Sequence, residues 1–245
     1  MTSSGGAAVA AVPATSSAAG PSGTAPAPPP EAAVLGDALP VLEAYAALLA
    51  GPGVERGLLG PRETPRLWER HLLNSAGLAP LLAPGSTVAD LGSGAGLPGV
   101  VLAALRPDCR FVLVEPLLRR ATFLQEAVDA LGLDTVEVRR GRAEELAGRL
   151  EVDDVVARAV APLDRLAGWA LPLVRPGGRL LALKGDTAVA ELEQARPALR
   201  RAGAVSAEVV DVGDPLALTA GRVVVVVRGD APSAAAAPPP GRRRR

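Results

Sequence analysis

The sequence predicts an α/β fold: a doubly wound, mostly parallel sheet with an antiparallel last strand, preceded by a group of helices. Three observations lead to this prediction. From Ser86 onward, short apolar runs alternate with helical patterns, which is typical of parallel βαβ units. The last two strand runs have no helix pattern between them, so they should form an antiparallel hairpin. In residues 34–82, by contrast, the apolar side chains recur at helical spacing.

The elements follow in order along the chain. Gly51-Pro52-Gly53 and Gly60-Pro61 divide the first region into two or three helices, because glycine and proline interrupt helical patterns. The predicted strands cover residues 86–91, 110–114, 134–139, 153–159, 180–184, 205–212 and 222–228. The predicted helices of the sheet region cover residues 99–105, 117–131, 163–173 and 189–201.

The two ends of the chain differ from the middle in composition. Residues 1–30 carry no charged side chain and finish in a proline-rich run, and residues 231–245 are rich in alanine and proline and end in four arginines. Such segments bury too little apolar surface to offset the entropy cost of ordering, so we expect two disordered tails. A single domain is then predicted over residues 31–230. Its N-terminal helices cover residues 31–84, and its cofactor-binding sheet region covers residues 85–230.

Composition excludes several classes of protein. The one cysteine, Cys109, cannot form an internal disulfide, and with His71 as the one histidine it cannot build a Cys/His zinc site, so no metal is predicted. No apolar run approaches the roughly 20 residues that span a bilayer. The N-terminus lacks the pattern of a secretory signal, so we expect a cytoplasmic protein without membrane contact.

The net charge of zero is an average over unlike parts. The chain has 26 basic and 26 acidic residues, and setting the four terminal arginines aside leaves 22 basic residues. The predicted domain is therefore mildly acidic while the C-terminal tail concentrates positive charge. The zero does not argue against an RNA partner.

The most informative stretch is residues 88–99, which read Val-Ala-Asp-Leu-Gly-Ser-Gly-Ala-Gly-Leu-Pro-Gly. A predicted strand enters a loop with glycine at alternate positions, and a helix follows. Glycine lets the backbone bend sharply and lets a ligand approach it closely. Ligands of doubly wound sheets bind at the carboxyl ends of the strands, where this loop lies. The next strand ends in Glu115, whose carboxylate could accept hydrogen bonds from a ribose diol.

The glycine loop fits two classes of cofactor. Gly94 to Gly99 match the G-x-G-x-x-G spacing of dinucleotide-binding enzymes, but Asp90 at the strand end would repel a pyrophosphate. From Asp90 the loop reads D-x-G-x-G-x-G, which resembles the first motif of class I methyltransferases that use S-adenosylmethionine. Residues 173–180 resemble the turn before their fifth strand, and the terminal hairpin is similar to that of their sheet. A nicotinamide enzyme and a glycine loop without a ligand are the alternatives.

Five blocks of sequence, in this order and spacing, resemble the bacterial small-subunit rRNA methyltransferase G family, also called glucose-inhibited division protein B. The blocks are RHLLNS at 70–75, DLGSGAGLPG at 90–99, RAEE at 142–145, ARAVAP at 157–162 and ALKG at 182–185. The resemblance covers roughly residues 34–228. It implies a Rossmann-like class I fold, S-adenosylmethionine as cofactor, and methylation of N7 of a guanine in 16S rRNA. The substrate would be the RNA itself or a small-subunit particle.

The same resemblance implies individual cofactor contacts. Gly92 and Leu97 match the glycine-loop positions of the family, Ala143 and Glu144 match its adenine-side pair, and Arg158 matches an arginine at the end of its fourth strand. The predicted cofactor-binding residues are Gly92, Gly94, Leu97, Glu115, Ala143, Glu144 and Arg158. Residues 57–62 depart from the Asn-Leu-Thr stretch frequent in the family, so contacts of that segment are not carried over.

The reaction that the resemblance implies requires little acid–base chemistry from the protein. Guanine N7 carries an in-plane lone pair and no proton, so its methylation needs no general base, and we predict no catalytic residue. Holding the reactants in line can supply roughly 7–11 kcal/mol in good cases. Arg158 could contact a substrate phosphate, guanine O6 or the cofactor carboxylate, and the sequence leaves this choice open. It also leaves open whether His71 and Lys184 contact RNA or have local roles.

Two other functions compete with an rRNA methyltransferase. A small-molecule methyltransferase of the same fold would need a closed apolar pocket, and the aromatic content of 2% argues against one. A non-catalytic RNA-binding or assembly factor would have no need of the intact glycine loop, Glu115 and Glu144. Nothing in the sequence indicates an oligomer, so a monomer is the default expectation.

Overall fold

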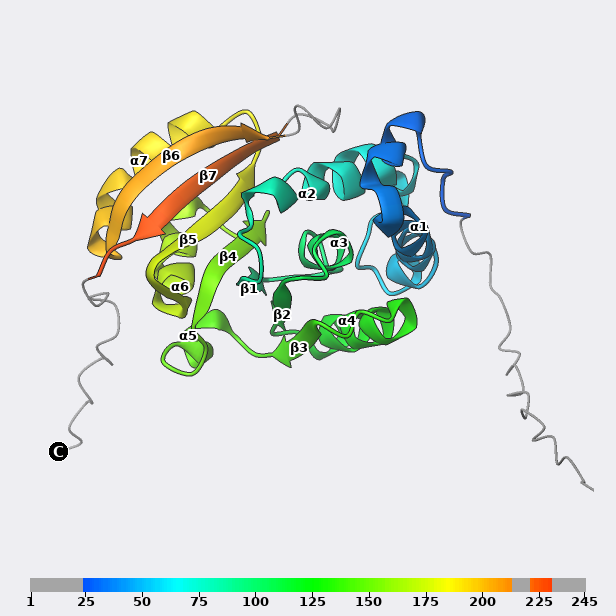
Figure 1. The fold of residues 1–245 in the computed structure, drawn as a ribbon, viewed down its shortest axis with the longest axis horizontal. Helices are drawn as coiled ribbons and strands as arrows, with labels where there is room; N and C mark the ends of the chain where they lie inside the picture. The colour runs from blue at the N-terminus through cyan, green and yellow to red at the C-terminus, as the bar shows by residue number, and fades with distance from the viewer. Residues whose placement is uncertain (1–23, 213–220, 231–245) are drawn as a thin grey trace, which may run out of the picture.

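A computed structural model describes residues 24–212 and 221–230 of the chain. In this part seven strands form one sheet, with β3 at one end and β6 at the other, in the order β3-β2-β1-β4-β5-β7-β6 (Figure 1). The strands are β1 (Thr87–Leu91), β2 (Arg110–Glu115), β3 (Val136–Arg140), β4 (Val152–Arg158), β5 (Val174–Lys184), β6 (Ala204–Val212) and β7 (Gly221–Arg228). The strands from β3 to β5 pair in parallel, and β7 is antiparallel to both β5 and β6. The predicted fold class, including the antiparallel last strand, is confirmed.

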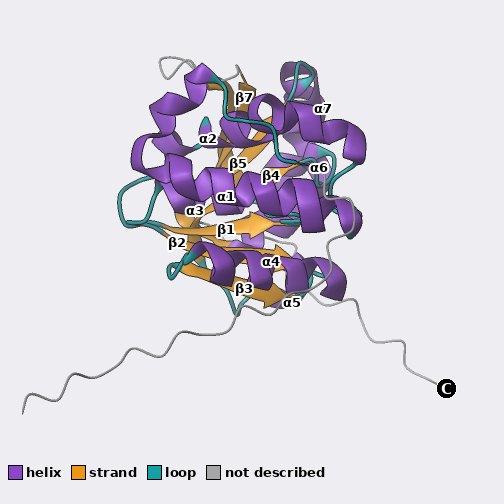
Figure 2. Cartoon of the chain, turned by 90° about the vertical axis from the view of Figure 1, so that its right-hand side faces the viewer, coloured by secondary structure: helices purple, strands orange, loops and turns teal. Residues whose placement is uncertain are grey.

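Helices cover both faces of the sheet. The helices are η1 (Pro30–Ala38), α1 (Leu39–Leu48), η2 (Leu49–Gly53), η3 (Pro61–Arg66), η4 (Leu67–Leu73), α2 (Asn74–Ala76), η5 (Ala79–Leu81), α3 (Gly99–Leu105), α4 (Leu118–Leu131), α5 (Ala143–Leu146), α6 (Leu163–Ala170), η6 (Leu171–Leu173) and α7 (Ala188–Arg201). The N-terminal helices pack with α3 and α4 on one face, where α1 and α4 lie side by side in front of the strands (Figure 2). Helices α5, α6 and α7 pack on the other face.

The sequence patterns explain this two-sided core. Successive side chains of a strand point to opposite faces, so Phe111 and Leu113 of β2 pack under α3 and α4, while Val112 and Val114 pack toward α6 and α7. In α7, the buried side chains recur every three or four residues, which gives the helix one apolar face. Helix α4 ends where Gly132 adopts a φ of 64°, a left-handed conformation that closes helices.

The structure differs from the sequence predictions in one helix, one strand start and the start of the folded region. No helix is predicted at α5, because its apolar residues are too few to show a period. Strand β5 begins at Val174, six residues before its predicted start, because Val174 pairs with Val152 ahead of an irregularity in the ladder. The folded region also begins before residue 31. Ala25 packs against the core, and the Trp68 indole N–H donates to the Pro26 carbonyl at 2.8 Å.

The rest of the two predicted tails lies outside the described residues. Residues 1–23 and 231–245, with the four terminal arginines, belong to this part of the chain. The predicted N-terminal tail therefore ends too late at residue 30, because residues 24–30 include an apolar contact and a backbone acceptor used by the domain.

The N-terminal helical stretch Pro30–Gly53 is longer and more apolar than the sequence analysis predicts, since no apolar run of membrane-spanning length is expected. By length and composition it is apolar enough to cross a membrane, with a mean hydropathy of 1.5. In the structure Leu42, Tyr45 and Leu49 are fully buried in the core of the domain. The helix is also interrupted at Gly36, whose φ of 54° is not helical. The apolar character of this stretch is thus used in packing within the domain.

Candidate cofactor and substrate site

The glycine loop between β1 and α3 requires glycine at particular positions. Gly92 and Gly94 have φ angles of 66° and 60°, in the left-handed region that disfavours side chains. A Cβ at Gly92 would lie 3.1 Å from the Val160 side chain. A Cβ at Gly94 would have no neighbour closer than 3.7 Å, so the loop is open at that point. The loop therefore presents backbone to a space that a ligand can enter.

Asp90, at the end of β1, is a buried carboxylate with one unpaired oxygen. Its Oδ2 accepts hydrogen bonds from the Ser93 hydroxyl at 2.7 Å and from the Gly99 amide at 3.0 Å. Its Oδ1 has no hydrogen-bond partner within the described structure. Burial raises the pKa of Asp90 to about 6, although both hydrogen bonds and the nearby Arg158 lower it. A buried carboxylate with a spare acceptor suits a ligand that carries a positively charged amine.

Glu115, at the end of β2, fixes the glycine loop. Its Oε2 accepts a hydrogen bond from the Gly94 amide at 3.0 Å, and its Oε1 accepts one from the Leu117 amide at 2.9 Å. The side chain is buried, and the Arg120 guanidinium lies 3.9 Å from Oε2. From the sequence, Glu115 is predicted to accept hydrogen bonds from a ribose diol. The structure adds that this carboxylate ties the loop to β2 through backbone amides.

A small pocket of about 140 Å³ lies beside the glycine loop. It brings together Gly92, Ala143 and Glu144, three of the residues predicted to bind the cofactor. The Trp169 ring of α6 forms another wall, and the Arg165 guanidinium carbon lies 5.1 Å from the centre of that ring. The remaining wall is mostly apolar, which suits a flat heterocycle whose polar edge reaches Glu144 at the rim.

A larger cleft of about 630 Å³ lies at the carboxyl ends of β4 and β5. Five cationic side chains contribute to its lining, namely Arg66, Arg70, Arg158, Lys184 and Arg222. Acidic residues are present as well, at Glu69, Asp186 and Asp211. Ala159 lines this cleft and Val160, the next residue, lines the small pocket, so the segment after β4 borders both cavities and is the wall between them.

The backbone is strained at this shared wall. Ala159 is the one residue other than glycine with a positive φ, of 55°, in the described part of the chain. Such strain costs about 1–3 kcal/mol and persists where the surroundings hold it. The segment that follows β4 is therefore fixed between the pocket and the cleft.

Two basic residues of the cleft are held by hydrogen bonds. The Arg158 guanidinium donates to the Arg70 carbonyl at 3.2 Å and lies 2.9 Å from His71 Nδ1. Lys184 donates to the Ala161 carbonyl at 3.1 Å and forms an ion pair with Glu191 at 2.7 Å. Of the two roles that the sequence leaves open for Lys184, the structure shows a local one: this side chain joins β5 to α7.

Comparison with known proteins identifies the family. A sequence model described as rRNA small subunit methyltransferase G matches residues 38–218. The chain is 60% identical over 196 residues to the ribosomal RNA small subunit methyltransferase G of Thermobifida fusca, covering 78% of this chain and 82% of that protein. It is 55% identical over 208 residues to the protein of that name from Streptomyces avermitilis, covering 84% and 87%. The chain belongs to the rRNA small subunit methyltransferase G family.

A solved structure supports the fold. The crystal structure of cofactor-bound Rv0187 from MTB aligns with a TM-score of 0.53 and 21% sequence identity, covering 78% of this chain and 90% of that chain. At this identity the likeness concerns the fold alone. With the family match, it confirms the predicted class I methyltransferase fold, and S-adenosylmethionine is the cofactor of the family.

The structure divides the predicted methyltransferase G cofactor residues into groups. Gly92, Ala143 and Glu144 meet in the small pocket, and Gly94 is bonded to Glu115. Arg158 lies in the larger cleft instead. Leu97 is only 7% exposed and packs into the core, and its amide donates to the Ser93 carbonyl at 3.3 Å. The side chain of Leu97 therefore serves packing within this structure.

Sequence reasoning missed two residues of the site. Trp169 lines the small pocket, yet its sequence context is an ordinary amphipathic helix. Glu63 contacts His71 at 2.9 Å across a gap of eight residues, and no motif precedes it. The tryptophan in the segment after the fourth strand was a usable signal, because that segment borders the cofactor in doubly wound sheets.

Proposed function

We propose that this protein transfers a methyl group from S-adenosylmethionine to N7 of a guanine in 16S rRNA. The observation that carries the proposal is the arrangement of the two cavities. A small, largely apolar pocket beside the glycine loop shares the Ala159–Val160 wall with a larger cleft lined by cationic side chains. A cofactor in the first and a nucleotide in the second would meet at that wall.

The chain's residues fit the parts of the cofactor. Gly92, Ala143, Glu144 and Trp169 would enclose the adenine ring, since they line one small pocket beside the glycine loop. Glu115 would accept from the ribose hydroxyls with the lone pairs that the two backbone amides leave free.

The amino-acid end of the cofactor would lie beside Asp90 and Arg158. The unpaired Oδ1 of Asp90 would accept from the ammonium group. Arg158 would pair with the cofactor carboxylate. Its positive charge lies close enough to Asp90 to lower the pKa of that residue, so the two side chains could hold the two charged groups of one amino acid. When bound, the cofactor supplies an electrophilic methyl group.

The larger cleft fits an RNA substrate. Arg66, Arg70 and Arg222 line this cleft and would contact phosphates, which supply much of the affinity in protein–nucleic acid complexes. Guanine N7 has a lone pair and no proton, so the protein has to orient the base and exclude water rather than remove a proton. We therefore assign no catalytic acid or base.

The finer statements about partners belong to the same proposal. We propose that the protein acts in the cytoplasm, as a monomer and without a metal ion, on the small-subunit rRNA or on a particle that contains it. The name of the relatives supports rRNA as the class of substrate. The packing of residues 30–53 into the domain supports a protein that works away from the membrane.

A methyl-transfer assay tests the proposal. The protein would be incubated with tritiated S-adenosylmethionine and, in parallel, with undermethylated 30S particles, naked 16S rRNA and a metabolite extract. We expect label in the RNA, mapped by mass spectrometry to N7 of one guanine. Label in metabolites alone would favour a small-molecule methyltransferase, and cofactor binding without any transfer would favour a non-catalytic assembly factor.

A further inference from the structure

A chain of three side chains, in which His71 is buried and Glu63 and Arg158 are partly exposed, connects the N-terminal helices to the end of β4. Glu63 of η3 lies with its Oε2 2.9 Å from His71 Nε2 on η4. The other ring nitrogen, His71 Nδ1, lies 2.9 Å from the guanidinium of Arg158. His71 and Arg158 are 87 residues apart in the sequence, so only the fold brings them together.

The chain of hydrogen bonds fixes the protonation of the histidine. A guanidinium has five N–H donors and no acceptor, so His71 Nδ1 must be the acceptor of the bond to Arg158. Nδ1 is then without a proton, and the proton of the neutral ring lies on Nε2. That N–H donates to the Glu63 carboxylate. The geometry therefore selects the neutral Nε2–H tautomer of His71.

The electrostatic surroundings keep His71 neutral. Burial lowers the pKa of His71 first, and the positive charge of Arg158 lowers it further, while the hydrogen bond and charge of Glu63 oppose both effects. Arg70, on the same helix as His71, adds a smaller lowering effect. The bond to His71 in turn lowers the pKa of Glu63, which stays ionised. These three residues are the charged groups that act on the ring.

We propose that His71 is a positioning residue for Arg158, and that Glu63 fixes the tautomer that this role requires. The inference rests on the function proposed above, in which Arg158 pairs with the cofactor carboxylate. Two hydrogen bonds, to His71 Nδ1 and to the Arg70 carbonyl, hold the guanidinium and leave three N–H groups for a ligand. Protonation of His71 would place a proton on Nδ1, against the guanidinium. The bond would break and two cations would face each other, so acid would release Arg158 and weaken cofactor binding.

Nitrogen NMR of the protein without ligand tests the tautomer. His71 is the one histidine of the sequence, so ¹⁵N-histidine labelling gives one pair of ring signals. We expect an unprotonated Nδ1 and a protonated Nε2 at pH 7.5. Arg158→Gln should raise the pKa of His71 by removing the adjacent cation, and Glu63→Gln should lower it. A proton on Nδ1 in the wild type, or a pKa unmoved in both variants, would overturn the proposal.

Binding of S-adenosylhomocysteine, measured by calorimetry between pH 5 and 8, tests the positioning role. We expect wild-type affinity to fall about tenfold or more as His71 becomes protonated, which is the effect of losing a charge-assisted hydrogen bond. In Glu63→Gln the fall in affinity should occur at lower pH, by the same amount as the pKa of His71 measured by NMR. His71→Phe should bind about tenfold more weakly at neutral pH and lose this pH dependence.

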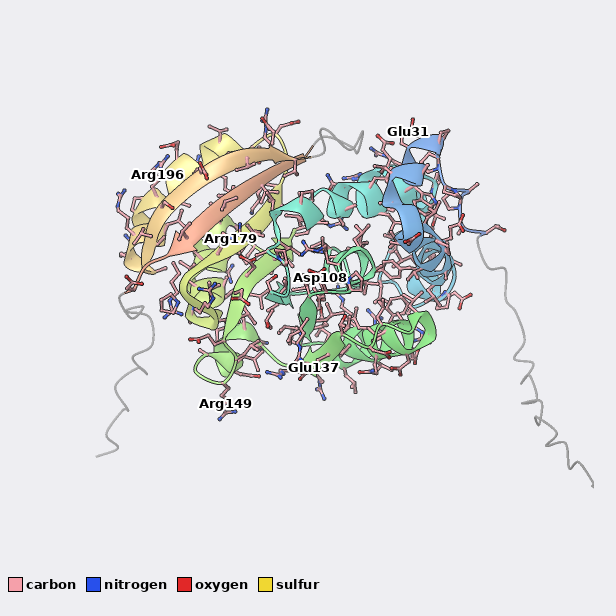
Figure 3. All side chains as sticks on the ribbon, in the orientation of Figure 1. Glu31, Asp108, Glu137, Arg149, Arg179 and Arg196 are labelled. Carbon is pink, nitrogen blue, oxygen red and sulfur yellow. The ribbon has the colours of Figure 1, made fainter. Side chains whose placement is uncertain are left out.

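Two features of the chain make the pH test selective. The pKa of Asp90 is also about 6, so Asp90 contributes to the pH dependence of binding as well. That contribution should be the same in the wild type and in the Glu63 and His71 variants. Glu193→Gln serves as a matched control, because Glu193 forms an exposed ion pair on α7 with Arg196, the residue labelled in Figure 3. Its pH profile should match the wild type.

The outcomes separate this inference from the proposed function. A wild-type protein that shows the expected tautomer and pH-dependent binding, yet methylates no RNA, would reject the proposed substrate and keep the role of His71. An active protein whose binding has the same pH profile in wild type and in Glu63→Gln would reject the role of His71 and keep the proposed function.

Discussion

The small pocket and the larger cleft lie side by side, but they are built in different ways. The pocket is lined mainly by segments at the strand ends, and the buried carboxylates Asp90 and Glu115, which adjoin these segments in the sequence, accept hydrogen bonds from backbone amides in or beside the glycine loop. The cleft is formed by side chains from segments far apart in the sequence, such as His71 and Arg158. A site made from backbone depends on local sequence, whereas a site made from long side chains depends on tertiary packing.

This difference predicts separate effects of mutation. Changes in the glycine loop should affect folding and cofactor binding together, because the loop is part of the core. Changes at the more exposed cations of the cleft, such as Arg66 and Arg222, should affect binding of ligands with little loss of stability, because exposed charges contribute little to folding. Five variants and one control test this contrast.

The largest effect is expected for Gly99→Ala. A Cβ at this position would lie 2.4 Å from the Leu113 side chain and 2.6 Å from Asp90 Oδ2. Overpacking of this kind destabilises a protein by about 1–3 kcal/mol or more, and we expect about 3 kcal/mol in urea unfolding. Gly94→Ala is the control, since a Cβ there meets open space and only the left-handed φ opposes it, at about 1–2 kcal/mol. Equal stability of both variants would contradict the described packing.

Asp90→Asn should stabilise the protein at neutral pH while weakening cofactor binding. The pKa of Asp90 rises from 3.8 to about 6 on folding, so the native state binds more protons and stability falls as pH rises through this window. The difference corresponds to about 3 kcal/mol at pH 7, which is the upper limit of the expected gain. The asparagine oxygen can still accept from Ser93 and Gly99.

Unfolding of this variant should be measured at pH 7.5 and at pH 3.5. Most of the gain should be lost at the lower pH, where the carboxyl group is protonated in the native state and largely protonated in the unfolded state. A gain that is the same at both pH values would show that ionisation of Asp90 is not its cause.

In the cleft, Arg158→Gln should weaken binding of S-adenosylhomocysteine about 10- to 100-fold, equivalent to about 1.4–2.7 kcal/mol. The reason is that the carboxylate of the bound ligand would lose the charged partner that we propose for it. Stability should change less than in Gly99→Ala, as judged by thermal unfolding. Unchanged cofactor affinity combined with weaker RNA binding would move Arg158 from the cofactor to the substrate.

The smallest effect is expected for Arg66→Gln and Arg222→Gln. Each variant removes one of the phosphate contacts proposed above, so RNA binding should weaken a few-fold and the slope of log affinity against log salt should fall by about one. Affinity for S-adenosylhomocysteine should stay at the wild-type value. Filter binding at several salt concentrations measures the slope, and an unaltered slope would place the RNA elsewhere.

The contrast between the two sites also explains what could be predicted from the sequence. The strands, the antiparallel β7 and the glycine loop follow from local patterns, which the residues of each element carry themselves. The pairing of Gly94 with Glu115 was within reach, because both lie at neighbouring strand ends.

Other features depend on contacts that no local pattern records. The chain from Glu63 through His71 to Arg158 requires that η3 and η4 pack over the end of β4. The burial of Leu97 depends on the N-terminal helices, against which its side chain packs. Likewise, the Pro26 carbonyl accepts a hydrogen bond from Trp68 of the domain, and the composition of residues 1–30 gives no sign of that contact.

The position of Trp169 gives the molecule a built-in optical signal. The sequence holds two tryptophans, and the indole of Trp68 is buried among the N-terminal helices and bonded to Pro26. Trp169 instead lines the pocket that we assign to adenine. Stacking of a heterocycle on this indole would change its emission, so Trp68→Phe would leave a protein whose intrinsic fluorescence reports occupancy of the pocket without any added label.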